Sequence, residues 1–376
     1  MLTDIQSELT KQITRFRQEK IEPTLAEDDQ NEKFRMEIYR ELGNLGTTGI
    51  PIKEEYGGAG LFYADLCVAL TELAKSSVSY AVTISVSSMV QGIIQEFGNP
   101  QQCQKFLPEL TSGQEIGAFA LTESGSGSDA ASLKMTAKKV KGGYNLNGSK
   151  MFITSAGIAK TYVVMARTGE AGAKGISAFI VPAGAAGFRI GKKEKKMGWK
   201  VSPTCELVFE NCFVPAENLL REEGMGFKIA VSALDKGRIT IGAIAVGVGQ
   251  RALDESVKYS LERSQFGQSI FDFQGLQFMM ADMATEIAAS NLLVERAAYN
   301  YDHGIKNQML ASMAKLKATD TAMKVSTDAV QIFGGVGYTC EYPVERLMRD
   351  AKVLQIVEGT NQIQKVIIAR QLKKQY

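Results

Sequence analysis

Histidine is almost absent from this chain, because its 376 residues include only His303. Histidine-based metal centres and Ser-His-Asp triads both need a histidine placed beside specific partners. His303 stands in YDHGIK, where the following glycine is typical of a helix end, so we interpret it as a solvated cap residue. Acid–base chemistry in this protein should therefore depend on a carboxylate.

Paired cysteines are missing as well. The five cysteines are scattered and form no C-x-x-C pair. This spacing favours buried free thiols over a zinc site or a disulfide framework. We therefore expect no metal site.

The sequence also lacks long apolar runs and any excess of charge. No stretch approaches the roughly 20 apolar residues that cross a bilayer. With 43 basic and 41 acidic residues, the net charge of +2 calls for neither a nucleic-acid nor a membrane partner. The start, MLTDIQSELTKQITRF, has no signal-like apolar region. We expect a cytoplasmic protein, or a mitochondrial matrix protein if a leader has been removed.

The periodicity of apolar residues changes twice along the chain. From 2 to about 110 it is helical, with breaks at Pro23, at PIKEEYGGAG and at Asn99-Pro100. Between about 115 and 218 short β-rich runs alternate with glycine-rich turns. Long helical stretches follow at roughly 224–261, 272–303 and 307–333. The sequence predicts an α+β protein with an N-terminal helical domain (1–114), a middle antiparallel β domain (115–221) and a C-terminal antiparallel helical bundle (222–376).

Two segments fit the glycine pattern G-x-G-x-x-A, one beginning at Gly125 and the other at Gly247. A dinucleotide fingerprint must join a strand to a helix within a βαβ unit. The first segment follows a strand in the β domain without a crossover helix, and the second lies inside a helical pattern. A nicotinamide site of the Rossmann type is therefore not expected.

The segment 117–129 places an apolar strand before a polar, glycine-rich loop. One interpretation is a hairpin end built from turn residues. In the other, backbone N–H groups and the hydroxyls of Thr122 and Ser128 face a flat polar ligand that the glycines allow to approach. Spacing alone leaves both open.

Seven motifs occur along the chain in the order FALTESGSGSD, GSKMFITSAG, LDKGRI, RSQFGQ, QIFGGVGY, MRDAK and VEGTNQIQ. In order and spacing they resemble the acyl-CoA dehydrogenase family, over nearly the whole chain. The resemblance implies the family's arrangement of helical, β and helical domains. It also implies FAD as cofactor and an acyl-CoA as substrate.

The first two motifs are implied to line the isoalloxazine ring of FAD. Thr154 is expected near flavin N5, and Phe152 over one face of the ring, while Ser128 should lie between cofactor and acyl-CoA. The residues implied to contact FAD here are Phe119, Leu121, Thr122, Ser128, Phe152, Ile153 and Thr154.

Three positions depart from the commonest family form. Phe152 replaces tryptophan, Ser155 replaces asparagine and Ser124 replaces proline. Phenylalanine keeps the apolar stacking surface but lacks the indole N–H. FAD binding is therefore still expected, with its fine tuning altered.

The resemblance also implies FAD contacts in the C-terminal bundle, some of them with FAD bound mainly to a neighbouring subunit. Without the resemblance, we would interpret Arg263 as a solvated charge and Gly334-Gly335 as a helix C-cap. The shared site implies a homo-oligomer, namely the family's homotetramer. The implied residues are Arg263, Phe266 and Gln274 for pyrophosphate and adenine, and Gln331, Gly334 and Gly335 for the neighbour's FAD.

Asp235 and Arg238 resemble the residues that hold the pantetheine and adenine parts of coenzyme A. Alternatively they form an i, i+3 ion pair on a helix face. The basic run 191–200 is interpreted as a solvated loop, because the family has a lysine-rich turn there.

Glu358 occupies the position of the family's catalytic base, with Gly359 beside it and Thr360 and Gln362 on FAD. An exposed glutamate is a weak base, so an apolar pocket should raise its pKa. In the family its backbone N–H also helps to bind the thioester oxygen. The alternative is a carboxylate favoured by a helix N-terminus.

The resemblance further implies a subgroup and a reaction. Isovaleryl- and long-chain members carry the base in the LDKGRI segment, where this chain has Gly237. We therefore expect dehydrogenation of a short- or medium-chain, or short-branched, acyl-CoA to its 2-enoyl form, with electrons passing to electron transfer flavoprotein. The alternatives are an oxidase that uses oxygen and a non-catalytic or nucleic-acid-binding relative.

Overall fold

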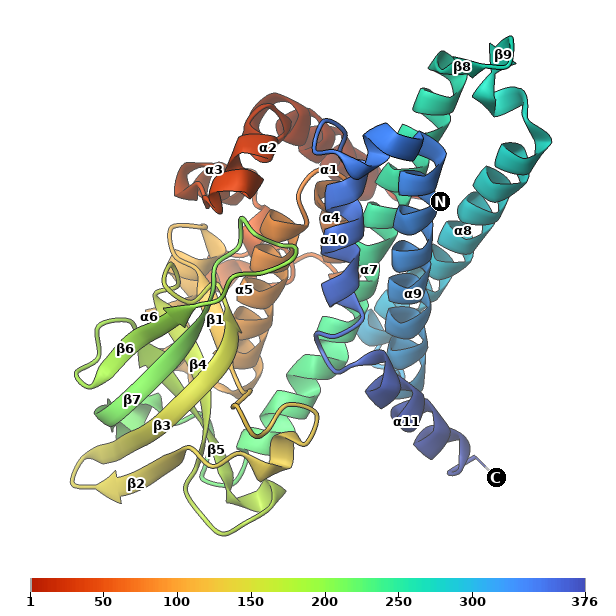
Figure 1. Ribbon diagram of the computed structural model, residues 1–376. Coiled ribbons are helices and arrows are strands. Elements are labelled where there is room, and N and C mark those ends of the chain that lie inside the picture. Colours follow the sequence, from red (N-terminus) through yellow and green to blue (C-terminus); the bar gives the residue numbers. More distant parts are fainter. Residues whose placement is uncertain (1, 376) are drawn as a thin grey trace.

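The structure, a computed structural model, describes residues 2–375 and begins with a helical region (Figure 1). Pro23 does not break this region, because it lies in the first turn of α2, directly after a π-helical turn at Arg17–Ile21. Asn99 does start a new helix, since its side chain accepts a hydrogen bond from the N–H of Gln102. The helices are α1 (Asp4–Phe16), α2 (Glu22–Asn31), α3 (Met36–Asn44), α4 (Tyr63–Ala74), α5 (Val78–Phe97) and α6 (Pro100–Thr111).

A seven-stranded sheet follows, in the order β1-β4-β2-β3-β7-β6, with β5 paired to β4. Most neighbours are antiparallel, but β2 pairs with β4 in parallel at Thr136 and Arg167, and β1 pairs with β4 in parallel along its whole length, so the expectation of an antiparallel domain was wrong on this point. Hairpin signals between consecutive strands could not reveal this pair, because β2 and β3 intervene in the sequence. The strands are β1 (Gly117–Ala120), β2 (Thr136–Val140), β3 (Gly143–Thr154), β4 (Thr161–Arg167), β5 (Ile176–Pro182), β6 (Phe188–Lys193) and β7 (Thr204–Pro215).

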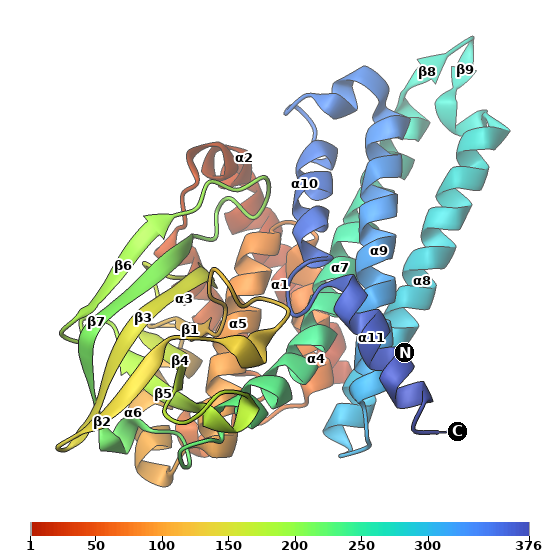
Figure 2. The same ribbon diagram turned by 60° about the horizontal axis from the view of Figure 1, so that its bottom comes forward.

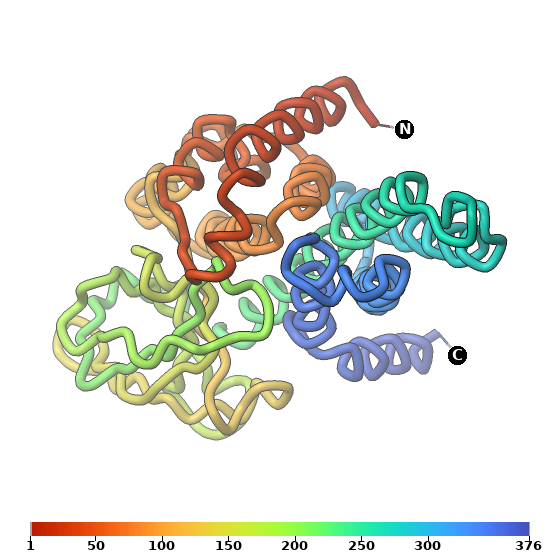
Figure 3. Tube along the Cα trace, turned by 45° about the horizontal axis from the view of Figure 1, so that its top comes forward, coloured from red at the N-terminus to blue at the C-terminus, as the bar shows by residue number. Residues whose placement is uncertain are grey.

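The C-terminal region is a bundle whose long helices extend away from the other two regions (Figures 2 and 3). Its helix bounds agree with the predicted stretches within a few residues. Tyr259 stacks on Phe333 with 4.1 Å between ring centroids, so the C-terminal ends of α7 and α9 lie together. The elements are α7 (Gly226–Glu262), β8 (Ser264–Gln265), β9 (Gln268–Ser269), α8 (Gln274–Asp302), α9 (Gln308–Phe333), α10 (Val344–Leu354) and α11 (Asn361–Leu372).

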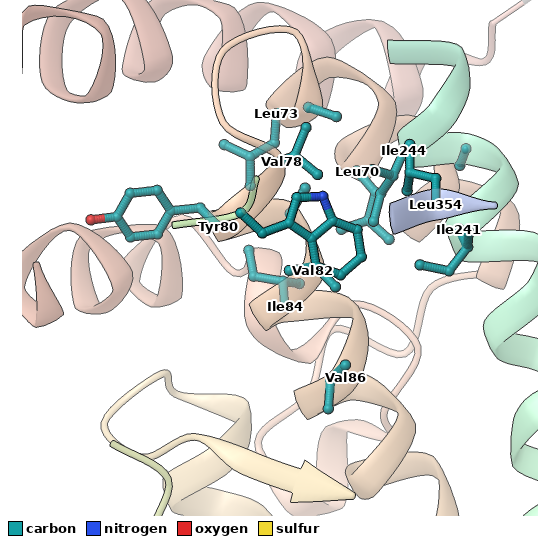
Figure 4. Packing of buried hydrophobic residues seen from close by; sticks show 14 of the residues in the cluster. Leu70, Leu73, Val78, Tyr80, Val82, Ile84, Val86, Ile241, Ile244 and Leu354 are labelled. Carbon is teal, nitrogen blue, oxygen red and sulfur yellow. The ribbon is translucent and has the colours of Figure 1, made fainter. Parts of the chain in front are cut away.

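The hydrophobic core joins the first helical region to the bundle. Figure 4 shows Leu70 of α4 beside Ile244 of α7, with Ile241 of α7 and Leu354 from the end of α10 next to them. Leu354 is fully buried. The segment that follows α10 therefore begins next to a residue that is held in the hydrophobic core.

Helix α10 is also fastened by polar contacts to the other two regions. The Trp199 N–H donates to Asp350 Oδ1 at 2.6 Å, and the Trp199 indole N–H donates to the Asp350 carbonyl at 3.1 Å. Arg349 pairs with Asp29 of α2 at 2.8 Å and donates to the carbonyl of Met197 at 3.0 Å. The start of the next segment is thus tied to all three regions.

Several minor expectations can be compared with the structure. His303 is an exposed C-cap of α8, as predicted. Four cysteines are buried free thiols, but Cys340 is exposed. Gly247 lies within α7, and Gly125 lies outside any helix, so neither belongs to a βαβ unit. Within residues 2–375, we find no helix that combines the length and the apolarity of a membrane span.

Candidate active site

The first two sequence motifs lie side by side at the end of the sheet. The Met151 N–H donates to the Thr122 carbonyl at 2.8 Å. The fully buried Lys150 ammonium donates to the Leu121 carbonyl at 2.9 Å and to the Glu123 carboxylate at 2.8 Å. These contacts hold the loop after β1 against β3, a role of Lys150 that its sequence position did not indicate.

This junction presents an exposed aromatic surface. Phe152 is 60% exposed, although it lies within a strand, and its φ is 58°. Such a backbone conformation is rare outside glycine and is typical of functional sites. Ser128 is exposed in the loop, and nothing lies within 4 Å of an added Cβ at Gly125 or Gly127. A flat ligand can therefore lie over Phe152 beside an open loop.

The carboxylate of Glu358 points against helix α7. Glu358 lies in the turn between α10 and α11, with φ of 55°. A Cβ added to Gly237 would lie 2.7 Å from Glu358 Cδ and 2.7 Å from Met89 Cε. Glu358 Oε2 is buried and has no hydrogen-bond partner. The carboxylate is therefore not bound to the N-terminal N–H groups of α11, which was the alternative interpretation.

Burial raises the pKa of Glu358 to about 7, against the opposing effect of the positive charges of Arg238 and Lys315. Arg238 is itself buried and forms an ion pair with Asp235, so the i, i+3 pair considered from the sequence is present. Burial lowers the pKa of Arg238, while Asp235 and Glu358 act in the opposite direction. The site thus holds a carboxyl group that exchanges its proton near neutral pH.

A buried polar network supports the segment that carries Glu358. Lys315 of α9 donates to the Gly359 carbonyl at 3.1 Å and to Asn361 Oδ1 at 2.8 Å. Gln364 donates to the same carbonyl at 2.8 Å, and Thr360 caps α11 by accepting from the Ile363 N–H.

Sequence reasoning missed Lys315 and Gln364. The only available signal was the position of Lys315 on the buried stripe of α9, which also contains Ala311, Ala318 and Ala322. A lysine inside an apolar stripe is unusual and indicates a buried partner.

The residues of the C-terminal bundle that were predicted to contact FAD lie away from both Glu358 and the sheet. All are exposed and gather where α7, α9 and the β8–β9 hairpin end, far from the sheet (Figures 1 and 2). Along α7, Arg263 lies about 38 Å from Arg238, at 1.5 Å per residue. Gly334 is the C-cap of α9, with φ of 65°. The residues at this end are Arg263, Phe266, Gln274, Gln331, Gly334 and Gly335, whereas Gln362 is exposed at the start of α11.

Three family models match the chain in succession. The description "Acyl-CoA dehydrogenase, N-terminal domain" matches residues 3–114, "middle domain" matches 118–212 and "C-terminal domain" matches 224–373. The chain therefore belongs to the acyl-CoA dehydrogenase family. It is an acyl-CoA dehydrogenase, a flavoprotein of the oxidoreductase class, and the family depends on FAD.

Similar proteins cover the chain almost completely. A short-chain specific acyl-CoA dehydrogenase of Clostridium acetobutylicum is 45% identical, covering 97% of each chain. Butyryl-CoA dehydrogenase of Megasphaera elsdenii has a TM-score of 0.97 at 45% identity and covers 99% of each chain. A chain in a structure of the electron transferring flavoprotein of Acidaminococcus fermentans has a TM-score of 0.98 at 47% identity, covering 99% of this chain and 98% of that one.

Proposed function

We propose that this enzyme oxidises a short-chain acyl-CoA to trans-2-enoyl-CoA, with Glu358 as the base that removes the α-proton. The carboxylate of Glu358, which faces Gly237 and has its Oε2 buried without a hydrogen-bond partner, is the observation that carries the proposal. A pKa of about 7 suits a base that must accept a proton and later release it. The alternative base position in α7 is glycine, so Glu358 has no competitor there.

The exposed Phe152 surface and the open loop at Gly125 and Gly127 fit a flavin. The residues proposed to hold it in this chain are Phe119, Leu121, Thr122, Ser128, Phe152, Ile153 and Thr154, with Thr360 and Gln362. FAD, when bound, supplies the acceptor for the hydride that leaves the β-carbon.

The substrate is proposed to bind with its thioester beside Gly359 and Ser128. Gly359 has φ of 87°, a backbone conformation that glycine adopts without strain. Arg238 and Asp235 are proposed to contact the coenzyme A portion, and Arg238 also stabilises the ionised base. A thioester oxygen that accepts the N–H of Glu358 would have its developing negative charge stabilised.

A short acyl chain is favoured by Met89 of α5. Its methyl group lies close to both Gly237 and the Glu358 carboxylate, so it limits the space beyond the base. The short-chain specificity of the Clostridium acetobutylicum relative and the butyryl-CoA activity of the Megasphaera elsdenii relative agree with this proposal.

A second copy of the chain is proposed to complete the cofactor site. Arg263 and Phe266 lie about 38 Å along α7 from the base region, farther than one dinucleotide reaches. Phe266 is 95% exposed, so its ring is free to contact another chain. We propose that this end binds FAD held by another copy, within a homotetramer. Electron transfer flavoprotein is the proposed electron acceptor, in line with the Acidaminococcus fermentans structure.

Anaerobic titration of the purified holoenzyme with butyryl-, octanoyl- and palmitoyl-CoA tests the proposal through bleaching of the flavin absorbance. Butyryl-CoA should bleach most completely. Glu358→Gln should keep bound FAD and acyl-CoA but lose bleaching, because an amide cannot accept the proton. Unchanged bleaching in this variant would remove Glu358 as the base, and best bleaching by palmitoyl-CoA would contradict the chain length.

A further inference from the structure

Lys315 is a completely buried lysine directly beneath the segment that carries the base. Its exposed fraction is 0%, although lysine is among the residues least often buried. Its two acceptors, the Gly359 carbonyl and Asn361 Oδ1, both belong to the turn that leads from Glu358 into α11. Burying an ammonium group costs free energy unless hydrogen-bond partners compensate for the lost water. The partners of Lys315 therefore indicate its role.

The segment needs external support. Glu358 and Gly359 both have left-handed backbone conformations, with φ of 55° and 87°. For Glu358, which carries a side chain, this conformation is strained and persists only where surrounding contacts hold it. The Gly359 carbonyl receives hydrogen bonds from Lys315 and from Gln364, while Asn361 is also bound to Thr319 and Asp320. Lys315 is the one charged donor among these contacts.

The charge of Lys315 also lowers the pKa of the Glu358 carboxyl group. The charged and titratable groups that face Glu358 are Arg238 from α7, Lys315 from α9 and Tyr63 from α4. Arg238 lowers the pKa of Glu358 more than Lys315 does, but Arg238 also forms an ion pair with Asp235. Both hydrogen-bond acceptors of Lys315 are neutral. Burial lowers the pKa of Lys315 to about 7, while the carboxylates of Glu358 and Asp320 favour its ammonium form. In its ammonium form, Lys315 therefore favours the ionised Glu358 carboxylate without having a direct ion-pair partner of its own.

We propose that Lys315 is a positioning residue for the catalytic base: its hydrogen bonds hold the Glu358-Gly359 turn in its left-handed form, and its charge favours the ionised carboxylate. The proposal rests on the proposed role of Glu358. It deepens that role by assigning the orientation and ionisation of the base to a residue that does not touch the substrate.

Three variants of the full-length holoenzyme separate the two effects. Lys315→Met removes donor and charge, Lys315→Gln keeps a donor without charge, and Lys317→Met is the matched control. Lys317 lies on the same helix but is partly exposed and pairs with Glu286. Hydrogen–deuterium exchange over residues 355–364 reports on the turn. The pH dependence of flavin reduction by butyryl-CoA reports on the base.

Lys315→Met should exchange the 355–364 segment at least about tenfold faster, and its reduction profile should move to higher pH by about one unit or more. Lys315→Gln should keep near-normal exchange but show the same upward shift, which a purely structural role would not produce. Lys317→Met should match the parent protein in both measurements.

Normal exchange together with an unshifted profile in Lys315→Met would overturn the proposal. If that variant does not fold, an unshifted profile in Lys315→Gln would overturn the electrostatic part. Should the parent enzyme itself fail to be reduced by butyryl-CoA, the proposed function fails, while the exchange comparison still tests whether Lys315 holds the turn.

Discussion

At the scale of single residues, the carboxylate of Glu358 occupies the space that a side chain at position 237 would fill. A glutamate at 358 and a bulky residue at 237 are therefore sterically incompatible. This gives a physical reason for the sequence pattern in which the base lies either in the LDKGRI segment or in the later one. In both cases a carboxylate would reach the same small volume beside Met89.

Gly237→Ala tests this steric relationship. The added methyl group should displace the carboxylate and slow flavin reduction by butyryl-CoA at least about tenfold, since small misplacements of a catalytic group are costly. FAD content should stay normal. Gly275→Ala is the control, because Gly275 lies in helix α8 with nothing within 4 Å of an added Cβ. Equal rates of flavin reduction in both variants would contradict the steric explanation.

The pKa of Glu358, about 7, predicts the pH dependence of the reductive step. The base must be ionised, so the rate of flavin reduction should rise with pH through about 7 and then level off. At pH 6 about a tenth of the base would be ionised, and the rate should be near a tenth of its plateau. Stopped-flow absorbance between pH 5.5 and 9 measures the profile. A rate independent of pH across this range would argue against a base with this pKa.

At the scale of elements, α10 links the base to the rest of the protein. Its end leads directly into the Glu358 turn, and the Asp350 contacts with Trp199 tie it to the β domain. Burial raises the pKa of Asp350 to about 6. The folded protein thus holds this proton more tightly than the unfolded chain does, so Asp350 favours unfolding as the pH rises through about 6.

Asp350→Asn should relieve this effect, because an asparagine oxygen can still accept the Trp199 N–H. We expect a gain in unfolding free energy of roughly 1–3 kcal/mol at pH 8 that vanishes below about pH 4. Thermal unfolding followed across this pH range provides the measurement. Asp254→Asn, at an exposed position of α7, serves as control, and a gain independent of pH would refute the explanation.

Helix positions were the most predictable elements, because long apolar periodicity dominates them. The expected stretch 224–261 corresponds to Gly226–Glu262, and 307–333 to Gln308–Phe333. The parallel β1–β4 pair could not be predicted, since it depends on contacts between distant strands. The motifs led to Glu358 and Phe152, but Lys315 and Lys150 needed the structure because their burial depends on packing from other elements.

At the scale of the whole molecule, the predicted FAD contacts are divided between two ends. A complementation experiment tests whether separate copies contribute them. Arg263→Ala alone should retain less FAD, and Glu358→Gln alone should be inactive. Co-expressed as differently tagged chains and purified as hybrids, they should regain activity, because an intact Glu358 can then meet an intact Arg263. Hybrids no more active than the two single variants would contradict a shared site.

Helix α7 also sets a limit on how this chain can change. It runs without interruption over 37 residues, with Gly237 and Arg238 near one end and the proposed contacts to another copy just beyond the other. One residue removed from its middle would turn one end relative to the other by about 100° and shorten the helix by about 1.5 Å. Substitutions there can be absorbed by repacking, whereas insertions and deletions cannot. The length of this helix, more than the identity of its central residues, is the property that natural variation must preserve.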